Sequence, residues 1–152
     1  MKTRQKGTAI VEFALILPLL LLLTMITTEF GRAIYQYNTI VKSVRNATRY
    51  LSLQTPITDT KITEAQNLVV FGNIAGTPPA LVPGLTLAQV ATTWQPTGSA
   101  PLINTVTVQV GYGPTGTPAQ KYTFIPLVAS VFGFNLGNVT YAPISATMRA
   151  PS

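Results

Sequence analysis

The longest apolar run in the chain is residues 8–31, TAIVEFALILPLLLLLTMITTEFG. As a helix its 24 residues would extend about 36 Å, enough to cross a hydrocarbon core of roughly 30 Å. Residues 13–28 are uncharged, and Glu12 and Glu29 lie at the two ends of that stretch. The pattern therefore predicts a transmembrane helix over 8–31. Pro18, which lacks a backbone N–H, predicts a bend in it.

After this run, apolar positions are spaced alternately by four and three residues, which is typical of an amphipathic helix. They are Phe30, Ile34, Tyr37, Val41, Val44, Thr48 and Leu51. The helix should therefore continue as a stalk over 32–54, with Pro56 ending it. Lys42, Arg45 and Arg49 form an adjoining stripe at similar spacing. The simplest interpretation is a solvated face, and the alternative is an interaction stripe for lipid headgroups or an acidic partner.

A second, shorter helix is predicted after the stalk. Asp59 or Thr60 can cap its start, Glu64 suits its first turn, and Gly72 marks its end. Its apolar face would be formed by Ile62, Ala65, Leu68 and Val69.

Beyond a loop rich in glycine and proline, alternating apolar and polar residues predict strands over 87–95, 104–112 and 139–149. Pro143 suggests an edge position or a bulge in the last of these strands. The apolar stretch 124–132, FIPLVASVF, predicts a short helix. Antiparallel strands with helices on one face give an α+β domain over 55–152, preceded by the long helix.

Composition narrows the possible functions. The 152 residues include no cysteine and no histidine, and their four acids are Glu12, Glu29, Asp59 and Glu64. The usual nucleophile, base and metal-ligand sets cannot be assembled from these residues, so we expect no enzyme activity, no cofactor and no bound metal. Residues 72–120 carry no charge. A nucleic-acid binder normally concentrates basic residues on its folded domain, so no nucleic-acid partner is expected.

Charge also predicts the orientation of the helix. Lys2, Arg4 and Lys6 precede the apolar run, and these three cations in six residues favour a cytoplasmic N-terminus. Arg32 and the basic stripe follow the run but are less densely placed. The domain over 55–152 is therefore expected outside the cytoplasm.

Three interpretations of the N-terminus remain open. A secretory signal peptide could be cleaved near Gly31-Arg32-Ala33, but its apolar region would be long and would contain Glu12. An uncleaved signal anchor explains the apolar run but neither Gly7 nor Glu12. In the third interpretation, Gly7 ends a basic leader of residues 1–7 and Thr8 begins the mature chain.

The third arrangement, Gly7 followed by TAIVEFALILPLLLLL, resembles the prepilin processing site of the TadE-like pseudopilins of Tad, or Flp-type, pilus systems. Further likeness lies in LILP around Pro18, in RNATRYL over 45–51, and in SATMR over 145–149. The resemblance implies cleavage between Gly7 and Thr8 by a prepilin peptidase. It also implies that Glu12, followed by Phe13, meets the new N-terminal amine of a neighbouring subunit and sets the register between subunits. A complementary ammonium offsets the desolvation of a carboxylate in apolar surroundings.

These observations favour a minor pilin or pseudopilin that acts by assembly, in adhesion or in the biogenesis of a surface appendage. The partners implied are the major Flp pilin, other minor pilins, the prepilin peptidase, the assembly platform of the bacterial inner membrane and the lipid bilayer. The protein would be a single-pass protein of that membrane, available for incorporation into an extracellular pilus. The alternatives are an uncleaved membrane-anchored envelope protein with an extracytoplasmic interaction domain, and a secreted domain.

Overall fold

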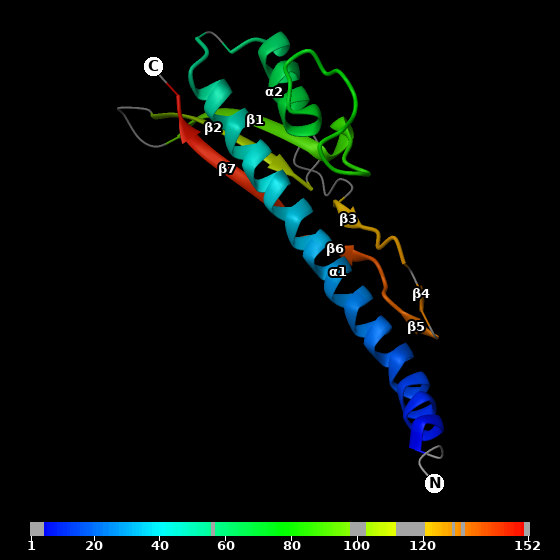
Figure 1. Ribbon diagram of the computed structural model, residues 1–152. Coiled ribbons are helices and arrows are strands. Elements are labelled where there is room, and N and C mark those ends of the chain that lie inside the picture. Colours follow the sequence, from blue (N-terminus) through cyan, green and yellow to red (C-terminus); the bar gives the residue numbers. More distant parts are fainter. Residues whose placement is uncertain are drawn as a thin grey trace. The chain divides into compact units, whose positions relative to one another are not determined.

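The computed structural model describes residues 5–55, 57–97, 103–111, 121–128, 130–131 and 133–150. It confirms the α+β class: a long N-terminal helix is followed by one shorter helix and by antiparallel sheets (Figure 1). The chain forms two compact units. The first contains the chain up to Ile34 together with Ile125–Asn138, and the second contains Tyr35–Phe124 and Val139–Ser152.

Helix α1, Gln5–Ser52, is continuous over 48 residues and includes Pro18. The predicted transmembrane and stalk segments are therefore parts of one helix. Its last turn contains Arg49, whose positive charge suits the negative end of the helix dipole. Pro56, the predicted stop, lies outside the described residues, as does the tetrapeptide 1–4 at the start of the predicted leader.

In the first unit, two short strands pair beside the N-terminal part of α1. Strand β4, Ser130–Val131, pairs antiparallel with β5, Phe134–Asn135. Gly133 lies in the turn between them with φ of 84°, a conformation that glycine adopts without steric cost. This segment replaces the helix that the sequence predicted over 124–132, so that prediction was wrong. The helix was predicted to start near Pro126, where proline is tolerated, so the failure lies in the apolar run itself, which fits a strand as well as a helix.

The main sheet belongs to the second unit. Its strands β1, Val90–Thr97, β2, Ile103–Val110, and β7, Ile144–Arg149, are antiparallel in the order β1-β2-β7. In β2, three valines are buried and alternate with half-buried polar residues, as the sequence predicted. On the polar side, Thr107 and Thr147 lie opposite each other and their hydroxyl oxygens are 2.7 Å apart. The first three residues of the predicted strand 87–95 instead form a 3₁₀ turn, η1, Leu87–Gln89.

The last predicted strand, over 139–149, is divided in two. Strand β6, Val139–Thr140, pairs with β3, Thr123–Phe124, whereas β7 joins the main sheet. The residues between β6 and β7 include Pro143, which cannot donate a ladder hydrogen bond. The break at Pro143 allows the two halves to enter different sheets.

The core of the second unit lies between helix faces and the main sheet. The fully buried side chains include Ile40, Val44, Leu51, Val69, Val70, Val90, Val106 and Val108. The buried Thr48 hydroxyl donates to the Val44 carbonyl and lies 3.4 Å from the carbonyl oxygen of Ala146 in β7. This contact shows that the last turns of α1 pack on the sheet.

Helix α2, Asp59–Phe71, begins one residue after its cap, Thr58. The Thr58 hydroxyl accepts a hydrogen bond from the backbone N–H of Lys61 at 3.4 Å, so the predicted cap at Asp59 or Thr60 was wrong. Its end at Gly72 is confirmed, because Gly72 has φ of 74° and donates to the Leu68 carbonyl.

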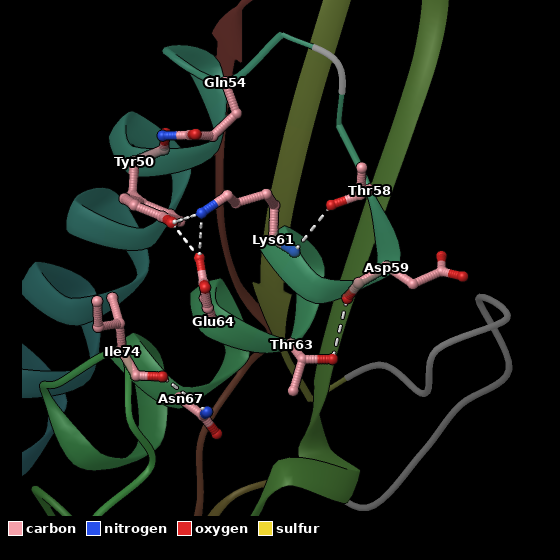
Figure 2. Close-up of polar contacts among 9 residues, drawn as sticks. All are labelled: Tyr50, Gln54, Thr58, Asp59, Lys61, Thr63, Glu64, Asn67 and Ile74. Carbon is pink, nitrogen blue, oxygen red and sulfur yellow. Dashed lines mark hydrogen bonds and ion pairs between the residues drawn. The ribbon is translucent and has the colours of Figure 1, made fainter.

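A polar cluster joins α2 to the end of α1 (Figure 2). The ammonium of Lys61 lies 2.8 Å from the Glu64 carboxylate and 3.2 Å from the Tyr50 hydroxyl, which donates to Glu64. The hydrogen bond with Lys61, and after it the one with Tyr50, holds the pKa of Glu64 below its usual value. The hydrogen bond with Glu64 raises the pKa of Lys61. The two charges stabilise one another at the contact between the helices.

The buried face of α1 differs from the predicted stripe. Val44, Thr48 and Leu51 are buried as predicted, but Phe30 and Ile34 are exposed. The buried positions before Val44 are Glu29, Ala33, Gln36, Ile40 and Ser43. An α-helix has 3.6 residues per turn, so a strict alternation of four and three drifts around it by about 20° per heptad.

The polar members of the buried face have partners. Gln36 accepts a hydrogen bond from the Tyr122 hydroxyl at 2.7 Å. Tyr141 packs on both Tyr37 and Tyr122, with ring centroids 5.5 and 5.4 Å apart. Apolar periodicity does not reveal these positions, because Gln36 is polar and its partner Tyr122 lies 86 residues along the chain.

Candidate functional site

The predicted processing site lies in the first turns of α1. Gly7, Thr8 and Glu12 lie on one side of the helix and line an open hollow together with Val11 and Leu15. All five are exposed. The spacing of four residues between Thr8 and Glu12 places them one helical turn apart on the same face.

Gly7 is not required by packing within the chain. A Cβ atom at this position would meet nothing within 4 Å. Glycine in a helix interior is nevertheless about 1 kcal/mol less favourable than alanine. The described part of the chain thus offers no packing reason for Gly7, which agrees with a role in recognition by another molecule.

Glu12 and Phe13 both face outwards. The Phe13 side chain is 60% exposed. Among the described residues, the ion pairs are Glu29 with Arg32 and Lys61 with Glu64, so none involves Glu12. An exposed carboxylate beside an exposed aromatic ring, within an apolar helix surface, is available to a neighbouring molecule.

Pro18 lies inside α1, and the helix continues on both sides of it. A proline removes one backbone hydrogen bond and crowds the carbonyl four residues earlier. The predicted bend at this position stays a prediction.

Lys42, Arg45 and Arg49 are exposed side chains on the second half of α1. Neither ion pair of the described part of the chain involves them. Their exposure fits the simpler interpretation of the basic stripe as a solvated face, and its use as an interaction surface stays a prediction.

Glu29, at the far end of the apolar run, has a different environment from Glu12. It is 8% exposed, and its carboxylate lies 3.4 Å from the Arg32 guanidinium. Arg32 also donates to the backbone carbonyl of Ile125 at 3.0 Å. The sequence predicts Glu29 at a membrane edge but does not reveal this contact, because Ile125 is 93 residues away from Arg32.

The helix that carries these residues is suited to a membrane. Among the described residues, the helical stretch Gly7–Ser52 is long and apolar enough to cross a bilayer. Leu15, Leu19 and Leu23 are 76, 66 and 61% exposed. Such a surface is unfavourable in water and favourable in hydrocarbon.

The same part of the chain matches a known protein family. Residues 7–49 match the family model of TadE-like proteins. The match confirms the TadE-like resemblance seen in the sequence. It begins at Gly7 and extends to Arg49, so it includes Glu12 and Pro18. No curated protein and no solved structure matches the chain.

The TadE-like match gives the geometry of α1 its functional context. The family is associated with the Tad pilus, so the match indicates a Tad-pilus-associated protein with an N-terminal membrane helix. The globular elements after residue 49 lie outside the matched range. Functional residues are therefore best sought on α1.

Proposed function

We propose that this protein is a minor pilin or pseudopilin of a Tad, or Flp-type, pilus system, cleaved after Gly7 by a prepilin peptidase. It acts by assembling with the major Flp pilin and other minor pilins on the inner-membrane assembly platform, in adhesion or appendage biogenesis, and it catalyses no reaction. The observation that carries this proposal is the TadE-like match, which starts at Gly7 and contains an exposed glutamate five positions later.

The position of Gly7 supports cleavage. Glycine weakens helical structure, because it gains less from the helical conformation than alanine does. The bond between Gly7 and Thr8 therefore opens into a protease at lower cost than a bond between two residues of high helix propensity.

Cleavage also gives Glu12 a partner. A free N-terminal amine has a pKa of about 7.7–8.0 and is mainly protonated at neutral pH. The amine of Thr8 on a neighbouring subunit can thus pair with the exposed carboxylate of Glu12, which selects one register between two otherwise apolar helices. A polar residue within an apolar helix contact is well suited to fixing register.

Orientation follows from the charges near the helix. The basic leader keeps the N-terminus in the cytoplasm, where the peptidase acts, and places the globular elements outside it. From the inner membrane, the mature chain enters a pilus or its initiating complex.

Intact mass of the membrane-extracted protein tests the proposal. We expect a chain that lacks Met1 to Gly7 and begins at Thr8, with or without a methylated amine. Gly7→Val should block this cleavage. Gly31→Val is the matched control, because Gly31 is also in α1 and a Cβ atom there also meets nothing within 4 Å.

Each contrary mass points to a different alternative. An intact N-terminus in the unsubstituted chain would favour an uncleaved membrane anchor. A start at Ile34 would favour secretion after signal-peptide cleavage. Equal processing of Gly7→Val and the unsubstituted chain would contradict recognition of Gly7.

A further inference from the structure

The segment 125–128, IPLV, lies against the end of the apolar run of α1, within the first compact unit. The Arg32 guanidinium donates to the Ile125 carbonyl at 3.0 Å. Val128 lines a hollow of about 180 Å³ together with Thr24, Met25, Thr28 and Glu29. The hydrogen bond therefore holds the start of the segment on α1, and its end faces the same helix across the hollow.

The contacts also show the direction of the segment along the helix. Ile125 is level with Arg32, whereas Val128 lies beside Thr24 and Met25. The same hollow is lined by Thr28 and Glu29, so Val128 lies about one to two helical turns before Arg32. From Ile125 to Val128 the chain therefore runs back towards the membrane-spanning part of α1, and β4 and β5 follow beside that part (Figure 1).

The outer surface of the segment is apolar. Ile125 is 66% exposed and Leu127 is 79% exposed. No charged residue occurs between Lys121 and Arg149. Exposing two such large apolar side chains to water is unfavourable.

Exposed apolar residues of α1 lie near this surface along the chain of contacts. Leu23 and Phe30, on either side of the Val128 contact along the helix, are 61 and 67% exposed. If α1 spans the bilayer, lipid that surrounds Leu23 also reaches Val128 and Leu127. The geometry therefore favours lipid over a soluble partner as the molecule that covers the apolar surface of the segment.

The position of Arg32 sets the depth of the segment. Arg32 closely follows the apolar run of α1 and donates to the Ile125 carbonyl. A guanidinium at the end of a transmembrane helix keeps its charge at the level of the headgroups, so we expect Ile125 at that level.

We propose that the segment 125–128 inserts into the outer interface of the membrane, where Ile125 and Leu127 contact lipid and the pair of Glu29 and Arg32 holds the segment on α1. The inference rests on the membrane anchoring that is part of the proposed function. It assigns a second membrane contact, formed 93 residues beyond Arg32 in the sequence. Such a contact limits tilting of α1 relative to the bilayer before the subunit leaves the membrane.

Fluorescence depth measurements test this second contact. The chain has no cysteine, so Leu127→Cys provides a single labelling site for an environment-sensitive dye. The full-length protein is placed in vesicles of phosphatidylethanolamine and phosphatidylglycerol. Quenching is measured with aqueous iodide and with lipids that carry a nitroxide near the headgroup. Leu53→Cys is the matched control outside the segment, because Leu53 is 71% exposed. Leu20→Cys reports on the span itself.

The label at Leu127 should be quenched by the lipid nitroxide, and iodide should quench it about threefold less than the label at Leu53, as for a side chain a few ångströms inside the interface. Ile125→Cys should behave in the same way. Equal iodide quenching at Leu127 and Leu53 would overturn the inference while leaving the proposed function intact.

Two other outcomes also decide the matter. Protection of the label at Leu127 from iodide that increases with protein density, without quenching by the lipid nitroxide, would overturn lipid contact. It would indicate that a second copy of the chain covers the segment. Strong iodide quenching of the label at Leu20 would show that α1 does not span the bilayer. In that case the anchoring, and the inference that rests on it, would both fail.

Discussion

Glu12 and Glu29 show how differently one residue type is used at the two ends of an apolar run. Glu29 is 8% exposed and lies 3.4 Å from Arg32, so its charge is balanced within the chain. Glu12 is exposed and takes part in neither ion pair of the described residues. A carboxylate near hydrocarbon is unfavourable without a cation. Glu12 therefore has the stronger need for a partner from another molecule.

The first prediction concerns the pairing of Glu12 with a cation of another subunit. In Glu12→Leu, membrane insertion should be intact, because leucine suits the apolar helix. Removing one member of a desolvated ion pair costs several kcal/mol, so the yield of other pilins that co-purify with the protein should fall about tenfold or more. The measurement is quantitative co-purification from detergent-solubilised membranes. Glu12→Asp, which keeps the charge, should retain part of the interaction.

Val11→Leu is the control for this experiment, because Val11 lies on the same open face and the substitution keeps it apolar. The yield of other pilins that co-purify with Val11→Leu should match the yield with the unsubstituted chain. Unchanged association and pilus assembly in Glu12→Leu would contradict the register role of Glu12.

At the scale of elements, α1 shows both the strength and the limit of apolar periodicity. The spacing of four and three correctly predicted a long helix and the buried Val44, Thr48 and Leu51. It failed at Ile34 and Phe30, because the real buried face includes Glu29, which forms an ion pair with Arg32, and Gln36, which accepts a hydrogen bond from Tyr122. A buried polar residue is acceptable only with such partners, and these are known only after folding.

The second prediction follows from this corrected face. Ile40→Ala should lower the free energy of unfolding by about 3 kcal/mol, because Ile40 is fully buried and the substitution leaves a cavity. Ile34→Ala, at a position that is 46% exposed, should change it by less than about 0.5 kcal/mol. The measurement is urea unfolding in detergent, followed by fluorescence of Trp94, the only tryptophan of the chain.

A similar loss of stability in both variants would contradict the corrected face. It would indicate that Ile34 packs against the domain, as the alternation of four and three predicted.

The stretch 124–132 was the main failure among the shorter elements. The sequence predicted a helix there, but a run of nine apolar and small residues does not distinguish helix from strand. In the structure, Phe124 pairs with Val139 and Val131 pairs with Phe134. The pairing of Val131 with Phe134 is local and depends on the turn at Gly133. The pairing of Phe124 with Val139 depends on the return of the chain 15 residues later.

At the scale of the whole molecule, the described cations fall on one side of the apolar run of α1. Lys42, Arg45 and Arg49 follow it and are exposed, while the basic leader that precedes it has no described side chains. Orientation in the membrane therefore rests on the sequence argument from the leader.

The third prediction tests that orientation. A cysteine at Leu53, an exposed position just after α1, should react with a membrane-impermeant maleimide added to spheroplasts. A cysteine at Gln5, in a chain kept uncleaved by Gly7→Val, should react only after lysis. The reverse pattern of labelling would contradict a cytoplasmic N-terminus.

The sequence by itself determined the long apolar helix, the position of Gly7 and Glu12 on it, and the TadE-like match over 7–49. These features are local: they depend on residue spacing within one helix and need no knowledge of distant contacts. Only the tertiary structure decided that Glu29 is paired and covered, that Gln36 is buried, and that the segment 125–128 returns to the end of the membrane helix. Those features depend on contacts between residues up to 93 positions apart, which are set by the packing of the whole chain and not by any local pattern.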